Sequence, residues 1–84
     1  MTRRTLKMTK QNLVQKLNDM YYNAPQGEKV SMIHLFGIKY SEEIKECDAS
    51  TKEIAKAADI NESYGTEISK GVKLGHYVDV KPTI

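Results

Sequence analysis

The sequence of 84 residues predicts a mainly α-helical fold, a small helical bundle in a single domain. Its composition, 39% hydrophobic and 29% charged, is that of a folded, water-soluble chain rather than a disordered one. Apolar residues recur at the three- and four-residue spacing of amphipathic helices. Serine and threonine stand where such segments begin, as helix caps do. These observations together favour a helical bundle.

The first helix is predicted to start at Thr9, which serves as its N-cap. Its apolar stripe consists of Leu13, Leu17, Met20 and Tyr21. The helix has to end by Asn23-Ala24, because Pro25 disfavours helical geometry in the residue before it. Residues 23–27 are therefore expected to form a turn. Residues 1–8 carry basic residues and no apolar pattern, so they are expected to form a flexible basic arm.

Residues 28–40 form an apolar run that fits neither the helical nor the strand period. Such a run is either a buried strand or a buried helix, and periodicity alone does not decide between them. We favour a helix from Glu28 to Phe36, closed by Gly37 in the left-handed conformation that glycine allows. Its apolar character on all sides predicts the most buried element. A short helix capped by Ser41 is expected to follow over 41–46.

Ser50 and Glu53 have the spacing of a capping box, in which each side chain bonds the other residue's free backbone N–H. The helix that follows presents Ile54, Ala55 and Ala58 on one face. Asp59 and Ile60 then provide a turn and an apolar plug. A second helix is expected to begin at 61–63, to be anchored by Ile68 and to end at Gly71, a C′ glycine.

Residues 76–81 are rich in strand-forming residues and stop at Pro82. A short C-terminal strand or wing is therefore expected, and the only evident pairing partner is the segment 36–38. The predicted organisation is the basic arm, a single domain over 9–81 and a tail over 82–84.

The segment from Thr51 to Gly71 resembles the helix-turn-helix of phage repressors over its whole length. The matching features are an apolar-small pair, Ile54-Ala55, the plug Ile60 and the anchor Ile68. Two positions depart from the pattern. Asp59 stands where glycine is usual, although aspartate tolerates left-handed geometry better than most residues. Gly65 replaces a branched apolar residue, and Tyr64 is the candidate to supply the missing side chain.

This resemblance implies that the second helix enters the major groove of DNA. Its outward residues are the candidates for base contacts: Asn61, Glu62, Ser63, Thr66, Glu67 and Lys70. Basic residues around the motif are the candidates for phosphate contacts: Arg3, Arg4, Lys52, Lys56 and Lys73.

The net charge of +2 conceals an uneven distribution. Residues 1–24 carry five basic residues against one acidic, residues 25–68 five against nine, and residues 69–84 three against one. The helix over 61–70 has one lysine and two glutamates. Affinity for DNA comes largely from neutralising phosphates. We therefore expect weak binding by the isolated domain, helped by a homodimer or by a larger DNA-processing protein.

A second resemblance rests on three sequence segments, Met20 to Val30, Ile33 to Tyr40 and Tyr64 to Gly71. They are similar to the helix-turn-helix-like domain associated with McrA-type, modification-dependent HNH restriction endonucleases, over about residues 10–80. The resemblance implies a DNA-associated accessory domain of a restriction or DNA-processing system. The chain lacks the HNH catalytic set, so nuclease activity is not carried over.

No enzymatic activity, catalytic residue, metal, cofactor or small-molecule substrate is expected. A chain of this length buries only about 60% of its unfolded surface, so few residues are available to enclose a pocket. Cys47 is expected to be an inert thiol, His34 a hydrogen-bonded core residue and His76 an exposed residue able to reach phosphate.

The sequence contains neither an apolar run long enough to span a membrane nor a signal peptide. Its single cysteine cannot form an internal disulfide, which favours a reducing, cytoplasmic location. Two functions remain open: a DNA-binding domain, either a small regulator or an accessory module, and a protein-interaction module of the same fold that never contacts DNA.

Overall fold

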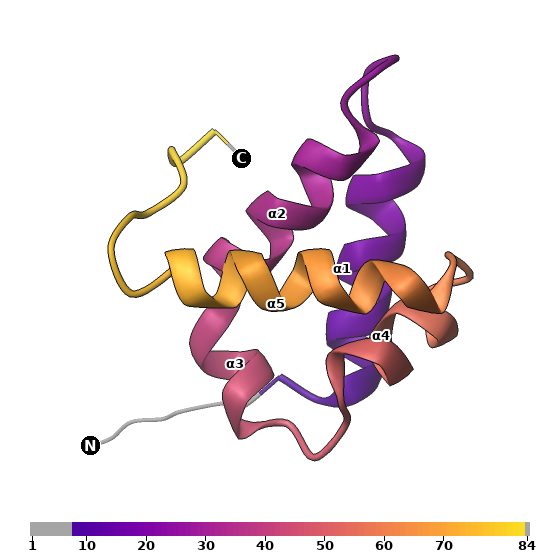
Figure 1. The fold of residues 1–84 in the computed structure, drawn as a ribbon, viewed down its shortest axis with the longest axis vertical. Helices are drawn as coiled ribbons and strands as arrows, with labels where there is room; N and C mark the ends of the chain where they lie inside the picture. Colours follow the sequence, from indigo (N-terminus) through magenta and orange to yellow (C-terminus); the bar gives the residue numbers. More distant parts are fainter. Residues whose placement is uncertain (1–7, 84) are drawn as a thin grey trace.

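The computed structural model describes residues 8–83 and shows six helical segments in this part of the chain (Figure 1). They are α1 (Lys10–Tyr22), α2 (Lys29–Lys39), α3 (Ser41–Glu46), α4 (Thr51–Ala57), the 3₁₀ helix η1 (Glu62–Tyr64) and α5 (Gly65–Leu74). The predicted mainly helical fold is confirmed. No helix within residues 8–83 has the length and apolarity needed to cross a bilayer.

Helix α1 begins as the sequence predicts. The Thr9 hydroxyl accepts a hydrogen bond from the Asn12 backbone N–H at 3.1 Å, and the Asn12 side chain accepts one from the Thr9 N–H at 3.3 Å. This reciprocal pair satisfies two backbone donors that a helix start leaves free. Leu13 and Leu17 are fully buried, and the helix ends at Tyr22, ahead of the turn that contains Pro25.

Helix α2 resolves the ambiguous run over 28–40 in favour of a helix, but the predicted end at Gly37 is wrong. The helix continues through Gly37 to Lys39. Gly37 lies where α2 crosses α5, and a Cβ added to it would stand 2.8 Å from the Cα of Gly71. The glycine is present because two helix backbones touch there, not because a helix stops.

Gly71 is the other half of this crossing, and its predicted role as a C′ glycine is wrong for the same reason. It lies inside α5, which ends at Leu74 with Gly75 as its C-cap. The C-cap has right-handed geometry, with φ −60° and ψ −14°. The contact between α2 and α5 is the most extensive between any two elements of the described chain.

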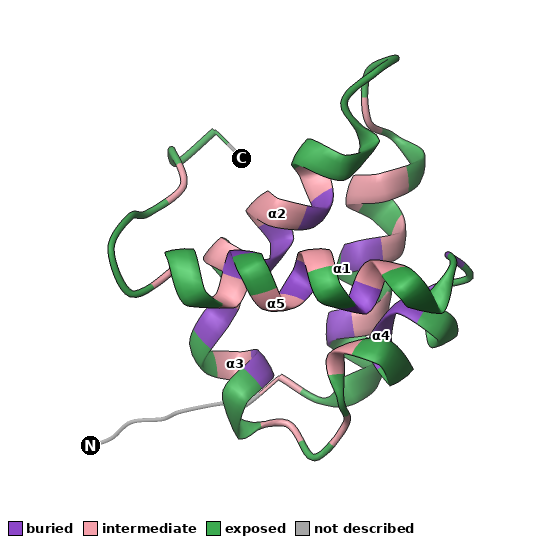
Figure 2. Cartoon of the chain, viewed as in Figure 1, coloured by how far each residue is buried: buried purple, intermediate pink, exposed green. Residues whose placement is uncertain are grey.

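The core gathers residues from every helix except η1, together with Ile60 of the turn (Figure 2). Its members are Leu13, Leu17, Ile33, Phe36, Ile44, Ile54, Ala55, Ala58, Ile60 and Ile68. Helix α2, predicted to be the most buried element, has one side in the core and another partly exposed to solvent. Ile33 and Phe36 face the core, whereas Val30 is 41% exposed on the same helix.

Two smaller corrections concern α3 and the C-terminal segment. Tyr40, not Ser41, precedes the first residue of α3, and Ser41 is buried against Gly75. Residues 76–81 form no strand, so the predicted wing is wrong. The segment 36–38, its expected pairing partner, is part of α2 and has its backbone groups committed to that helix.

Candidate nucleic-acid interface

Helices α4 and α5, with the turn between them, form the predicted helix-turn-helix. Helix α4 starts with the predicted capping box: the Glu53 N–H donates to the Ser50 hydroxyl at 3.1 Å, and the Ser50 N–H donates to the Glu53 carboxylate at 2.8 Å. The hydrogen bond from the Ser50 backbone, joined by one from its side chain, lowers the pKa of Glu53. Ile54 and Ala55 are fully buried.

The turn after α4 depends on Asp59, which has a φ of 66°. It is the only non-glycine residue of the described chain with a positive φ, so aspartate fills the left-handed position where the repressor pattern has glycine. Ile60 then enters the core, and its N–H donates to the carbonyl of Ala55 at 3.2 Å. The predicted turn and plug are both confirmed.

Two side chains of α1 hold this turn, through contacts that were not predicted from the sequence. The Asn18 amide donates to the carbonyl of Ala58 at 3.0 Å, and the Tyr22 hydroxyl donates to the carbonyl of Asp59. Carbonyls at a helix C-terminus have no partner within the helix, so these bonds satisfy groups that would otherwise need water. The partners lie 40 and 37 residues apart, which no local pattern reveals.

A cluster of aromatic rings supports the same corner of the molecule. The Tyr21 ring lies 4.9 Å from that of Tyr22 and 6.2 Å from that of Tyr64, and Lys29 Nζ lies 4.6 Å above it. Burial raises the pKa of the Tyr21 phenol, and the neighbouring tyrosines add to the shift. Tyr64 packs against the core from η1, as expected of the residue beside Gly65.

The second helix begins differently from the prediction. Residues 62–64 form a 3₁₀ turn, and α5 starts only at Gly65. The Asn61 side chain caps this turn, with its oxygen accepting from the Ser63 N–H at 2.9 Å. A bidentate contact with adenine needs both the oxygen and the nitrogen of the amide. In Asn61 one lone pair of this oxygen is therefore used by the cap, and the other lone pair and the amide N–H groups are left for a base.

Gly65, which departs from the repressor pattern, is required by the packing of α4 against α5. It is buried, and a Cβ on it would stand 2.8 Å from the backbone N and Cα of Lys52. The backbones of α4 and α5 thus meet at this residue. The Thr51 and Ser69 hydroxyls, 3.0 Å apart, form a hydrogen bond across the same junction.

The outward side of α5 carries Thr66, Lys70 and Lys73, all exposed and spaced at i, i+4 and i+7. Asn61, Glu62 and Ser63 are exposed on the preceding turn, and Lys52 and Lys56 are exposed on α4. A shallow groove runs between the two helices. Eight residues line it: Thr51, Lys52, Asn61, Glu62, Ser63, Gly65, Thr66 and Ser69.

Both acidic candidates for base contacts form ion pairs with other residues of the domain. Glu62 pairs with Lys52 at 3.7 Å on the exposed surface. The Glu67 side chain, 23% exposed, turns toward α2 rather than outward. Arg3 and Arg4, the candidates on the N-terminal arm, lie outside the described residues.

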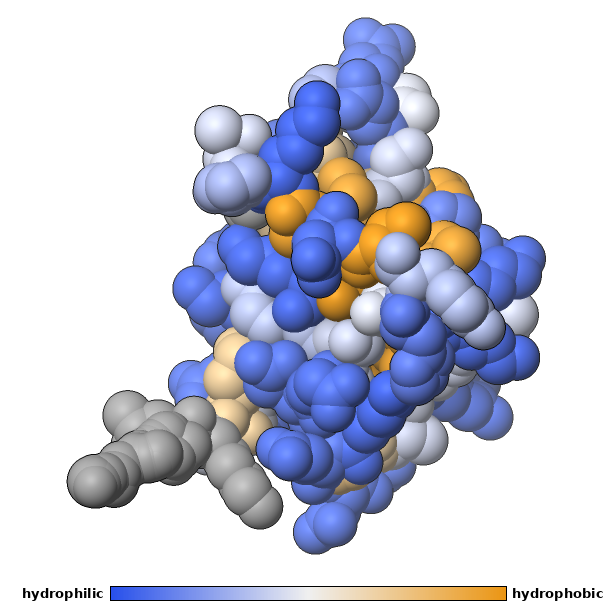
Figure 3. Space-filling view, turned by 90° about the vertical axis from the view of Figure 1, so that its left-hand side faces the viewer, coloured by the Kyte–Doolittle hydropathy of each residue, from blue (hydrophilic) through white to orange (hydrophobic). Residues whose placement is uncertain are grey.

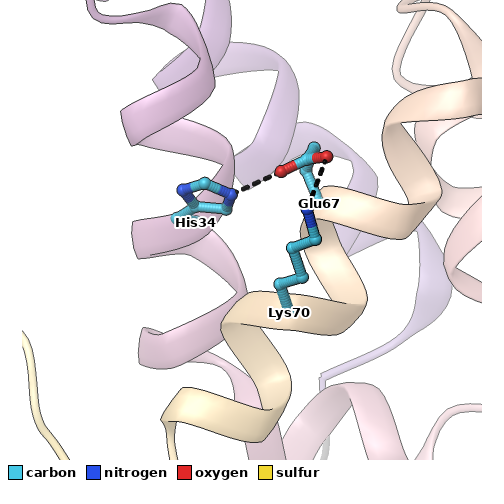
Figure 4. A network of polar contacts seen from close by, with 3 residues as sticks. All are labelled: His34, Glu67 and Lys70. Carbon is cyan, nitrogen blue, oxygen red and sulfur yellow. Dashed lines mark hydrogen bonds and ion pairs between the residues drawn. The ribbon is translucent and has the colours of Figure 1, made fainter.

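Glu67 stands between two basic partners (Figure 4). One carboxylate oxygen lies 2.6 Å from Nε2 of His34 on α2, and the other lies 3.3 Å from Nζ of Lys70, one turn further along α5. The hydrogen bond from His34 lowers the pKa of Glu67; partial desolvation opposes the shift, and Lys70 reinforces it. His34 is hydrogen-bonded, as expected, although it is half-buried rather than part of the core.

The remaining candidates for chemistry lie apart from this surface. Cys47 is a half-buried free thiol, and His76 is exposed, with its ring nitrogen 3.1 Å from Nζ of Lys45. Among residues 8–83 no three His, Cys, Asp or Glu side chains gather closely enough to hold a metal ion.

The capped first helix, the left-handed turn and the exposed second helix define a helix-turn-helix domain. The family model described as HTH-like domain matches residues 9–81, and the chain therefore belongs to this family. A search of curated proteins found no match. A search of solved structures found none either.

Proposed function

We propose that the domain binds double-stranded DNA, with α5 in the major groove. The observation that carries this proposal is the exposed stripe of Thr66, Lys70 and Lys73 on the second helix of a helix-turn-helix. Repressor-type domains read DNA with this helix. Family membership supports the same general function.

Within this interface the side chains have different roles. Ser63 and Thr66 present hydroxyls able to bond base edges, since each can donate and accept. Lys52, Lys56 and Lys73 are exposed on α4 and α5, and we assign them to phosphate contacts. Glu53, Glu62 and Glu67 offset part of this positive charge, so we expect modest affinity from one copy and stronger binding from a dimer or a larger protein.

The wider setting that we propose is a restriction or DNA-processing system, in which the domain is an accessory recognition module. This part of the proposal rests on the sequence resemblance to the domain that accompanies McrA-type endonucleases. A small stand-alone regulator is the other form that the same DNA contact can take.

The test is a titration of fluorescent duplex DNA at about 50 mM and about 200 mM salt, because releasing counterions makes phosphate-driven binding weaken as salt rises. Lys73→Gln should weaken binding and flatten its salt dependence. Lys16→Gln is the matched control, since Lys16 is exposed on α1, outside the helix-turn-helix. Equal effects of the two changes would contradict the assignment of α5.

A second candidate function is docking to another protein, and exposed apolar surface favours it. Tyr77 is 84% exposed, and Leu74 and Val78 are each nearly half exposed. Figure 3 shows apolar surface gathered on the side of the molecule where α2 and the C-terminal segment lie. Absence of duplex binding at about 50 mM salt would favour this function over DNA binding.

A further inference from the structure

Glu67 is the only acidic residue of α5, and it directly follows Thr66 of the exposed stripe. A carboxylate on a helix that enters the major groove faces the phosphates of both strands. Coulomb repulsion then opposes binding unless the charge is turned away or compensated. How the protein orients Glu67 therefore bears on the proposed DNA contact.

The orientation comes from α2. His34 Nε2 holds one oxygen of the carboxylate at 2.6 Å, while Lys70 reaches the other at 3.3 Å (Figure 4). Because both oxygens are engaged by different residues, the carboxylate is fixed between the two helices. Its 23% exposure agrees with this placement.

The distance between His34 and Glu67 is set by backbone packing. Helices α2 and α5 cross at Gly37 and Gly71, and the carbonyl carbon of His34 lies 3.2 Å from the position of a Cβ on Gly71. Glu67 lies one turn before Gly71 on α5. The close approach of the two backbones therefore brings the His34 imidazole within hydrogen-bond distance of the Glu67 carboxylate. A surface pair of two long side chains has no such constraint.

We propose that His34 is a positioning residue for DNA binding: it holds the Glu67 carboxylate toward α2, so that Glu67 engages Lys70 through one oxygen only and the other two N–H donors of Lys70 can reach phosphate. The inference rests on the proposed function. Without His34, Glu67 keeps its bond to Lys70, so the carboxylate follows Lys70 to the outward face and competes with phosphate for its ammonium group.

The experiment is a double-mutant cycle on duplex affinity, with the full chain carrying His34→Ala, Glu67→Gln or both. We expect His34→Ala to weaken binding about threefold to tenfold, in the range of couplings between residues in contact. Its plot of log affinity against log salt should lose about one unit of slope, as when one phosphate contact is lost. In the Glu67→Gln background the same change should have no effect, because no charge is left to position.

Rescue and control variants separate positioning from stability. His34→Gln keeps an N–H donor near the place of Nε2 and should restore most of the affinity. Any loss of folded protein caused by His34→Ala would appear in the single and the double variant alike. Glu62→Gln removes an exposed carboxylate that pairs with Lys52, and with His34→Ala its effect should be additive.

Each other outcome overturns the inference. If the wild-type chain binds duplex with the expected salt dependence but His34→Ala binds equally well, or loses the same affinity in the Glu67→Gln background, His34 does not position Glu67. If the wild-type chain fails to bind at about 50 mM salt, the proposed function fails and the inference fails with it.

Discussion

Gly37 and Gly71 meet where α2 crosses α5, at a separation that leaves no room for a methyl group on either residue. The close approach brings the two backbones together and places the side chain of His34 beside that of Glu67. One steric relationship thus fixes both the packing of the second helix and the direction of its acidic residue.

Gly71→Ala should destabilise the protein by about 2 kcal/mol or more, because overpacking a tight contact outweighs the roughly 1 kcal/mol that alanine gains in helix propensity. A Cβ there would stand 2.9 Å from the Cα of Gly37 and closer to the carbonyl oxygen of His34. Urea unfolding followed by circular dichroism measures the change. An unchanged midpoint would show that the helices do not touch at this position.

Asp59→Gly should leave the free energy of unfolding unchanged or raise it, whereas Asp59→Ala should lower it by about 1 kcal/mol. The reason is the φ of 66°, which costs a residue with a Cβ more than it costs glycine. Both variants remove the Asp59 carboxylate, so a difference in stability between them does not come from the loss of its charge. Equal stability of both would contradict the left-handed turn.

Tyr22→Phe should cost about 1 kcal/mol, the usual net value of one hydrogen bond, since its hydroxyl donates to the carbonyl of Asp59. Amide chemical shifts over 58–61 should move with it. Tyr77→Phe is the control, because Tyr77 is 84% exposed and its substitution should leave stability within about 0.5 kcal/mol.

Glu67 should stabilise the folded protein at neutral pH, and this contribution should be lost in acid. Its pKa is lowered in the folded state, chiefly by the hydrogen bond from His34, so its contribution is present above the unfolded pKa of about 4.3 and is lost as pH falls through the folded pKa. Melting temperatures at pH 6 and pH 3 should therefore differ less in Glu67→Gln than in the wild type. An equal difference in the two proteins would argue against the bond to His34.

Thr66→Ala should fold like the wild type, because Thr66 is exposed on α5, and should weaken any preference for one DNA sequence over another. Competition between duplexes of different sequence measures the preference. Ser31→Ala, exposed on α2, is the matched control. Unchanged preference in Thr66→Ala would show that this side of α5 does not read bases.

Signals within a few residues of one another were sufficient to predict the starts of α1 and α4 and the turn after α4. The N-cap Thr9, the capping box of Ser50 and the left-handed Asp59 involve neighbours three residues apart or a single backbone angle. The inward positions of Ile54, Ile60 and Ile68 follow from helical spacing and from the polarity of the residues between them.

Tertiary packing decided the rest. Glycine is common both at helix ends and where two helices cross, so its presence in the sequence does not distinguish the two. Only the packing of α2 against α5 shows that Gly37 and Gly71 belong to a crossing. The direction of Glu67 depends on a histidine 33 residues away. Caps and periodicity arise from atoms that are neighbours along the chain, whereas close approaches and long-range hydrogen bonds exist only after the helices have packed.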